Sequence, residues 1–91
     1  MKMFEEEIER EREAIDNIDE EITKLLTSRF EVVERIKNLK LSANIQIFQP
    51  ERERKIIENL RNEKHSEHLQ EIFKKIMEEA KKHQKQNDNN N

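Results

Sequence analysis

The first half of the chain repeats apolar residues at steps of three and four positions. The repeat comprises Phe4, Ile8, Ile15, Ile18, Ile22, Leu25, Val32, Ile36 and Leu39. Such steps place side chains on one face of an α-helix. No Pro or Gly interrupts this stretch, so we predict a single helix from Met3 to Leu41.

Charged residues occupy or flank this apolar stripe. Glu11 and Arg29 fall on it, and Arg12 and Lys40 lie beside it. Long charged side chains are rarely buried unless something pairs with them. Several cations on an inward face therefore indicate a buried anionic ligand. The alternative is that Arg29 pairs with a glutamate across a coiled-coil seam, while Arg12 and Lys40 extend into solvent.

The length of the predicted helix favours a homodimer. At 1.5 Å per residue it would span about 57 Å, too long for two short following helices to cover. Arg12 and Arg29 would lie about 25 Å apart along it, so one chain cannot bring both to a small ligand. In an antiparallel dimer, Arg12 of one chain lies near Arg29 and Lys40 of the other. Two equivalent sites follow.

A loop and a second helix are predicted next. The loop covers Ser42 to Gln49, and its apolar residues Ile45, Ile47 and Phe48 are expected to pack down. Pro50 suits the first position of a helix, where a missing N–H costs nothing. The apolar residues of this second helix are Ile56, Ile57 and Leu60.

A third helix is predicted after a weak break at Lys64 to Glu67. Its apolar face comprises Leu69, Ile72, Phe73, Ile76, Met77 and Ala80, and Gln84 continues that face. The polar end, Gln86 to Asn91, is predicted to be disordered. We therefore expect one helical domain over residues 1–85 and a tail over residues 86–91.

Composition supports an all-α fold. Charged residues make up 43% of the chain and hydrophobic residues 32%, with no Gly, which tight hairpins favour. A net charge of −3 with mixed signs disfavours nucleic-acid binding. No apolar run suits a bilayer span or a signal peptide, so we expect a cytoplasmic protein. The length of 91 residues suits one small domain, and hence a monofunctional protein.

Most catalytic chemistries lack support in this sequence. There is no Cys to act as a nucleophile and no Gly for a phosphate-binding loop. His65, His68 and His83 do not make up a zinc-ligand pattern, and no Ser–His–acid triad spacing is persuasive. We therefore expect no metal and no cofactor.

An ordered set of motifs resembles the all-helical chorismate mutase family. The motifs are Arg12 to Asp19, Leu25 to Arg29, Val33 with Ile36 and Lys40, Pro50 to Glu53, and Ile72 to Gln84. Each is weak alone, but their order and spacing together are specific. The resemblance covers about Ile8 to Gln84.

The resemblance implies an intertwined homodimer of three-helix chains. It implies conversion of chorismate to prephenate, a pericyclic rearrangement on the route to phenylalanine and tyrosine. That reaction needs no general acid, nucleophile or metal. It needs a dianionic substrate held in its reactive conformation, with charge placed where the ether bond breaks.

The resemblance also implies roles for the cations and for one amide. Arg12 from the partner chain and Arg29 would bind the two carboxylates. Lys40 would contact a carboxylate and the ether oxygen, and Gln84 would donate a second hydrogen bond to that oxygen. Catalysis would depend on Lys40, Gln84 and Arg29, whereas Arg12 would only bind substrate.

The second helix would hold the ring end of the substrate. By resemblance, Glu53 accepts from the ring hydroxyl and Arg52 supports the same end. The chain departs from the family pattern at Gln49, where an acidic residue is common, and at Ala80, where a serine is common. Weaker substrate binding is expected from both departures.

Two alternatives remain open from the sequence. Isochorismate pyruvate-lyases look similar, although the full set of five residues favours the mutase: Arg12, Arg29, Lys40, Glu53 and Gln84. The other alternative is a non-catalytic coiled-coil interaction module, in which the inward charges only set register.

Overall fold

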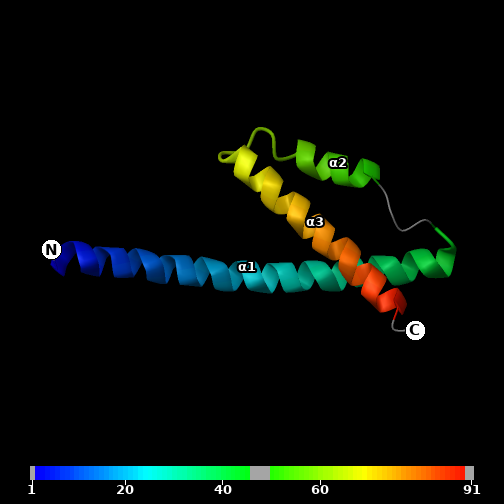
Figure 1. Cartoon of the computed structure of the whole chain (residues 1–91), viewed down its shortest axis with the longest axis horizontal. Coiled ribbons are helices and arrows are strands. Elements are labelled where there is room, and N and C mark those ends of the chain that lie inside the picture. The colour runs from blue at the N-terminus through cyan, green and yellow to red at the C-terminus, as the bar shows by residue number, and fades with distance from the viewer. Residues whose placement is uncertain (1, 46–49, 90–91) are drawn as a thin grey trace. The chain divides into compact units, whose positions relative to one another are not determined.

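The described part of the chain is entirely helical apart from its turns. The computed structural model describes residues 2–45 and 50–89, and the side chains up to residue 84. Within these ranges it contains three helices and no strand: α1 (Lys2–Ala43), α2 (Pro50–Glu58) and α3 (Ser66–Asn89) (Figure 1). The all-α class and the very long first helix were both predicted.

α1 ends two residues later than predicted, because Asn44 caps it. Asn44 has a left-handed backbone with φ of 57°. Its N–H donates to the Leu41 carbonyl at 3.3 Å, and the Ile45 N–H donates to the Lys40 carbonyl at 2.8 Å. This pair of bonds is a Schellman motif, which satisfies carbonyls that the helix end leaves open. Ser42 and Ala43, predicted to be loop, are therefore helical.

α2 begins at Pro50 as predicted, but it ends before Leu60. Leu60 lies in the turn, where its N–H donates to the Ile57 carbonyl at 3.1 Å. The break between the helices spans 59–65, earlier than the predicted Lys64 to Glu67. His65 closes it with a φ of 63°, a conformation that residue pattern alone does not reveal.

α3 continues to Asn89, into the stretch predicted to be a disordered tail. The polar residues there include no Pro or Gly, so nothing in them stops a helix that is already formed. Residues 90–91 lie outside the described part of the chain.

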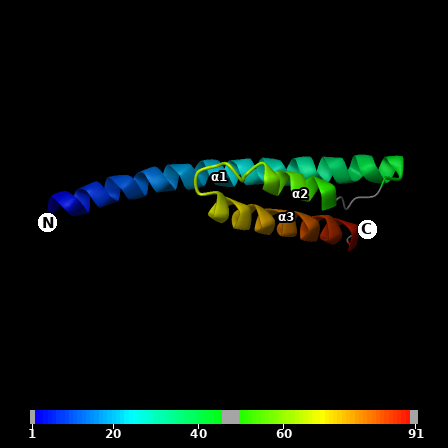
Figure 2. The ribbon, with the colours of Figure 1, turned by 90° about the horizontal axis from the view of Figure 1, so that it is seen from above.

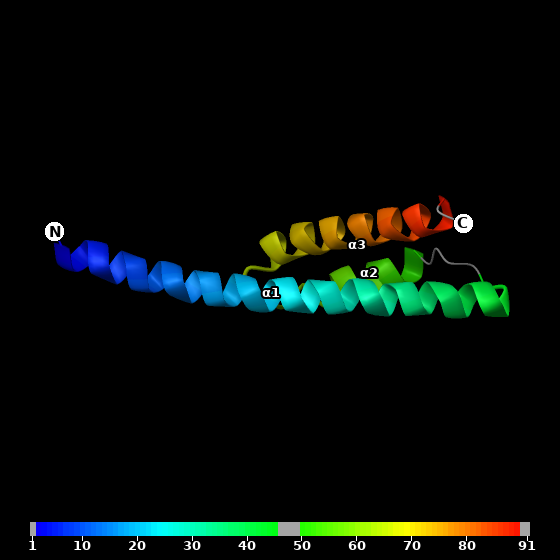
Figure 3. The same ribbon diagram turned by 90° about the horizontal axis from the view of Figure 1, so that it is seen from below.

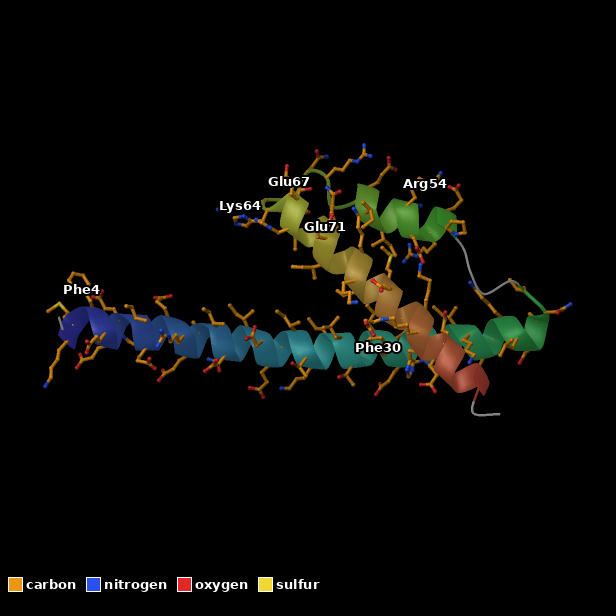
Figure 4. The ribbon with its side chains drawn as sticks, viewed as in Figure 1. Phe4, Phe30, Arg54, Lys64, Glu67 and Glu71 are labelled. Atoms are coloured by element: carbon orange, nitrogen blue, oxygen red, sulfur yellow. The ribbon has the colours of Figure 1, made fainter. Side chains whose placement is uncertain are left out.

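The chain divides into two compact units, Met1–Glu31 and Val32–Asn91. The first unit is a stretch of α1 whose apolar stripe faces solvent, as Phe4 does at its N-terminal end, where the residue is 68% exposed (Figure 4). Other exposed apolar residues of this unit are Met3, Ile8, Ile15, Ile18, Ile22 and Leu25. A single chain therefore leaves the predicted stripe uncovered.

The second unit contains the end of α1 together with α2 and α3. α2 and α3 are joined by the short turn and lie beside each other (Figures 2 and 3). Met77 and Ala80 are buried, and Ile57 and Phe73 are half-buried. This face of α3 was predicted, except that Ile72 is exposed.

The expectation that the apolar residues of the loop pack down is wrong at Ile45, the one of them that the structure describes. Ile45 is exposed and does not pack down, because it extends from the capped end of α1. Ile47 and Phe48 lie outside the described residues.

Candidate functional site

One turn of α3, residues 81–84, contacts both other helices of the second unit. The Lys81 ammonium lies 3.4 Å from a Glu53 carboxylate oxygen on α2. The Lys37 ammonium, on α1, donates to the Gln84 backbone carbonyl at 2.7 Å. These contacts link residues that are 28 and 47 positions apart in sequence. The turn is therefore the point where the three helices of this unit are tied together.

A third contact reinforces the same turn. His83 Nε2 lies 3.7 Å from Glu34 Oε2, which is on α1. This pair is an ion pair only when the imidazole is protonated, and both side chains remain partly exposed. Together with Lys37, it places two residues of α1 against two consecutive residues of α3.

Three of the predicted site residues belong to the helices that meet there. Lys40 lies one turn after Lys37 on α1, Glu53 bonds to Lys81, and Gln84 accepts the bond from Lys37. All three side chains are half-buried, as expected for groups that line a site. Arg52 is next to Glu53 on α2 and is exposed.

The other two predicted residues lie in the first unit. The Arg29 side chain is half-buried. Arg12 is exposed and forms an ion pair with Glu9, one turn earlier, at 2.8 Å. Their participation in the site remains a prediction.

Sequence reasoning missed Lys37 and Lys81. Lys37 precedes Lys40 by one turn, and Lys81 precedes Gln84 by one turn. Residues three or four positions apart share a helix face. That spacing to two predicted site residues was a usable signal, but in a chain with 43% charged residues most such lysines are simply solvated.

An open groove of about 540 Å³ lies along α2 and α3. Glu53 and Lys81 line it together with the apolar side chains of Ile57 and Met77. The groove thus carries an acceptor and a cation over an apolar floor, and it stays open to solvent on one side. Such a surface can hold a polar ring but does not enclose one.

Other charges of α3 are engaged along the helix surface. The Lys82 ammonium, which donates to the Glu79 carboxylate, and Lys75 lower the pKa of Glu79. The hydrogen bond to Glu79 and the nearby Glu78 charge raise the pKa of Lys75. These exposed groups therefore stay ionised and stabilise one another on the helix surface.

The described residues also allow a search for other kinds of site. Among residues 2–45 and 50–89, no three His, Cys, Asp or Glu side chains are grouped so that they could hold a metal ion. In the same part of the chain, no helix is long and apolar enough to cross a bilayer.

Comparison with known proteins places these residues in a family. A sequence model described as chorismate mutase type II matches residues 11–85, a range that includes every predicted site residue. A bifunctional chorismate mutase/prephenate dehydratase from Aquifex aeolicus (strain VF5) is 47% identical over 55 residues. That match covers 60% of this chain and 15% of the relative. No solved structure matches the chain. Because the family match spans most of its length, the chain belongs to the type II chorismate mutase family.

Proposed function

We propose that the protein is a chorismate mutase, which rearranges chorismate to prephenate in the biosynthesis of phenylalanine and tyrosine. The supporting observation is the meeting of three helices at residues 81–84 of α3, in a chain of this family. Those helices carry Lys40, Glu53 and Gln84. We propose that the enzyme acts in the cytoplasm.

The substrate is a dianion, and the arginines bind its two carboxylates. A guanidinium offers two parallel donors that match the two oxygens of a carboxylate. Arg29 supplies one such fork, and Arg12 of a second chain supplies the other. Two fixed carboxylates hold the flexible side chain of chorismate over its ring, which is the geometry that the rearrangement needs.

Lys40 and Gln84 act at the ether oxygen. Negative charge develops on that oxygen as its bond to the ring breaks. An ammonium and an amide N–H fixed beforehand stabilise this charge without having to reorganise. Glu53 accepts a hydrogen bond from the ring hydroxyl, and Arg52 supports the ring end. The bonds rearrange within one molecule, so no group of the protein gains or loses a proton.

The proposed enzyme is a homodimer. The stripe from Phe4 to Leu25 exposes large apolar side chains that a second copy would cover, and about 25 cal/mol is gained for each Å² of apolar surface removed from water. An antiparallel arrangement brings Arg12 of each chain to the Lys40, Glu53 and Gln84 of the other.

The deciding experiment is incubation of the purified protein with chorismate, with the products identified by NMR. We expect prephenate to form well above the uncatalysed rate. Lys40→Ala should lose this activity, whereas Lys24→Ala, the same change at an exposed lysine of α1, should retain it. Absence of prephenate would refute the proposal.

A parallel incubation with isochorismate tests the lyase alternative. The mutase proposal expects no release of pyruvate from that substrate. Pyruvate release without prephenate formation would assign the site to the lyase reaction instead.

A further inference from the structure

The one fully buried side chain in the described part of the chain belongs to a cation, Lys37, which is 2% exposed. Burying an ammonium is unfavourable unless its donors find acceptors. Lys37 places one donor 2.7 Å from the Gln84 carbonyl oxygen. The most completely buried residue is thus bonded to the backbone of the residue that would donate to the ether oxygen.

The acceptor can take this bond without disturbing α3. A carbonyl oxygen has two lone pairs, and a bond within the helix occupies one of them. The second lone pair of Gln84 is available to an ammonium approaching from the side. A bond from a charged donor is stronger than a neutral one, so it can hold α3 at a set distance from α1.

Lys37 lies on α1 close to Lys40, so its bond to Gln84 relates two residues of the proposed site. Lys40 follows by one turn, and side chains at such spacing emerge from the same face. Lys37 therefore links the helix segment carrying Lys40 to the backbone carrying the Gln84 side chain. Those are the two groups that the proposed mechanism directs at one oxygen atom.

We propose that Lys37 is a positioning residue of the mutase site, holding the Gln84 backbone against α1 so that the Gln84 amide and the Lys40 ammonium converge. This inference rests on the proposed function. It assigns Lys37 no contact with substrate. A methionine of similar length could fill the same space, and apolar replacements of buried charges are often neutral in stability. What such a replacement would lack is the bond that the ammonium donates to the Gln84 carbonyl.

The kinetic test combines Lys37→Met with Gln84→Ala in a double-mutant cycle. We expect Lys37→Met to lower kcat by about tenfold to hundredfold, as a misplaced group does, with KM changed less than about threefold. In the Gln84→Ala background the same change should have almost no further effect, because the group that it positions is gone. Lys24→Met, at an exposed site of α1, should leave kcat unchanged.

Two outcomes would overturn the inference. One is an unchanged kcat in Lys37→Met. The other is a double variant whose loss equals the product of the two single losses, since Lys37 would then act independently of Gln84. Circular dichroism establishes that the variant is folded, and Lys37→Leu, which also lacks a donor, replaces it with the same expected outcomes if Lys37→Met does not fold.

A second readout separates this inference from the proposed function. In ¹⁵N-labelled protein without substrate, Lys37→Met should shift the backbone amide resonances around Gln84, where a carbonyl loses its donor. Lys24→Met should not shift them. Unchanged resonances would mean that Lys37 does not bond to the Gln84 carbonyl in solution. Shifted resonances in a protein that does not convert chorismate would reject only the mutase proposal.

Discussion

The two units of the chain use the same apolar periodicity with opposite results. In Met1–Glu31 the stripe is exposed, with Ile22 still 47% exposed. In Val32–Asn91 part of the apolar face of α3 is covered, with Met77 and Ala80 buried, although Ile72 and the α1 residues Val32, Ile36 and Leu39 stay exposed. The difference shows that an apolar stripe in the sequence identifies a helix and its apolar face. It does not identify what covers that face.

Polar contacts differ between the units in the same way. In the first unit they link neighbouring turns, as Arg12 with Glu9 and Thr27 with the Thr23 carbonyl. The second unit has such contacts as well, but Lys37 and Lys81 also link separate helices there. One unit has assembled its polar groups into tertiary structure, and the other presents them on a bare helix. The proposed dimer accounts for this contrast, since each bare segment would complete the other chain's site.

The sharpest test of the comparison mixes two inactive variants, one from each unit. Arg12→Ala and Lys40→Ala should each lose about 10²–10³ in rate, the usual loss for one transition-state contact. When they are unfolded and refolded together, half of the dimers are mixed, and each mixed dimer has one intact site. About one quarter of the parent activity should return.

The matched control pairs two variants of the second unit. Lys40→Ala mixed with Glu53→Ala should recover nothing, because each site in the mixed dimer then has one defect. Recovery in that mixture, or none with Arg12→Ala, would mean that the first unit does not complete the partner's site.

Gln84→Glu tests whether Gln84, in the second unit, donates to the ether oxygen in the reaction. A carboxylate cannot donate to the ether oxygen, whereas a protonated carboxyl can. We expect a loss of about 10² in rate at neutral pH, with activity returning below about pH 4. Gln70→Glu, on the same helix where the amide bonds to Ser66, should keep the parent profile. A flat pH profile in Gln84→Glu would remove this residue from the mechanism.

Ile22→Glu tests the bare stripe. Burial of such a side chain in a dimer is worth about 1.5–3 kcal/mol per chain, so the variant should dissociate in sedimentation and melt at a lower temperature. Thr23→Glu introduces the same charge one position later, on another face, and should change stability by less than about 0.5 kcal/mol. Equal behaviour of the two variants would mean that nothing covers the stripe.

Lys81→Met tests the contact between α2 and α3 at Glu53. Partly exposed ion pairs contribute at most about 1 kcal/mol, so we expect KM for chorismate to rise by about fivefold at most. Lys82→Met, whose ammonium bonds to Glu79 on its own helix, should leave KM unchanged. Steady-state kinetics measures KM for chorismate in both variants. Identical KM values would mean that Lys81 has no part in substrate binding.

The smallest effect is expected for Glu79→Gln on the surface of α3. The lowered pKa of Glu79 means that its contribution to stability is present above the ordinary value of 4.5 and is lost as the pH falls through the lowered pKa. The variant should therefore be slightly less stable than the parent at pH 7, and the difference should shrink as the pH falls through the lowered pKa of Glu79. Urea unfolding over a series of acidic pH values measures this, and a difference that does not shrink would assign it to another cause.

Much of the fold could be predicted because the chain has no Gly and one Pro. Without other breakers, periodicity locates α1 and α3, and Pro50 marks the start of α2. The ends could not be placed as well, because they depend on Asn44 and His65 adopting left-handed backbones. Those conformations are local choices that a residue pattern leaves open.

The candidate site divides in the same manner. Lys40 and Gln84 stood out as polar residues near apolar faces and Glu53 stood out by the family resemblance, and the structure brings their helices together. Lys37 did not stand out, because its spacing to Lys40 is common among solvated lysines and because its partner is a backbone carbonyl. Every residue has a backbone carbonyl, so no residue type in the sequence indicates that Lys37 would bond to the one at Gln84.

The cap at Asn44 fixes the residue at which α1 ends. Each residue added to a helix advances it by about 1.5 Å and turns it by about 100°. If α1 stopped one residue later, the chain would leave it in a different direction relative to Lys37 and Lys40. The left-handed backbone of Asn44 thereby sets the direction in which Ile45 leaves α1, relative to the face that carries these two lysines.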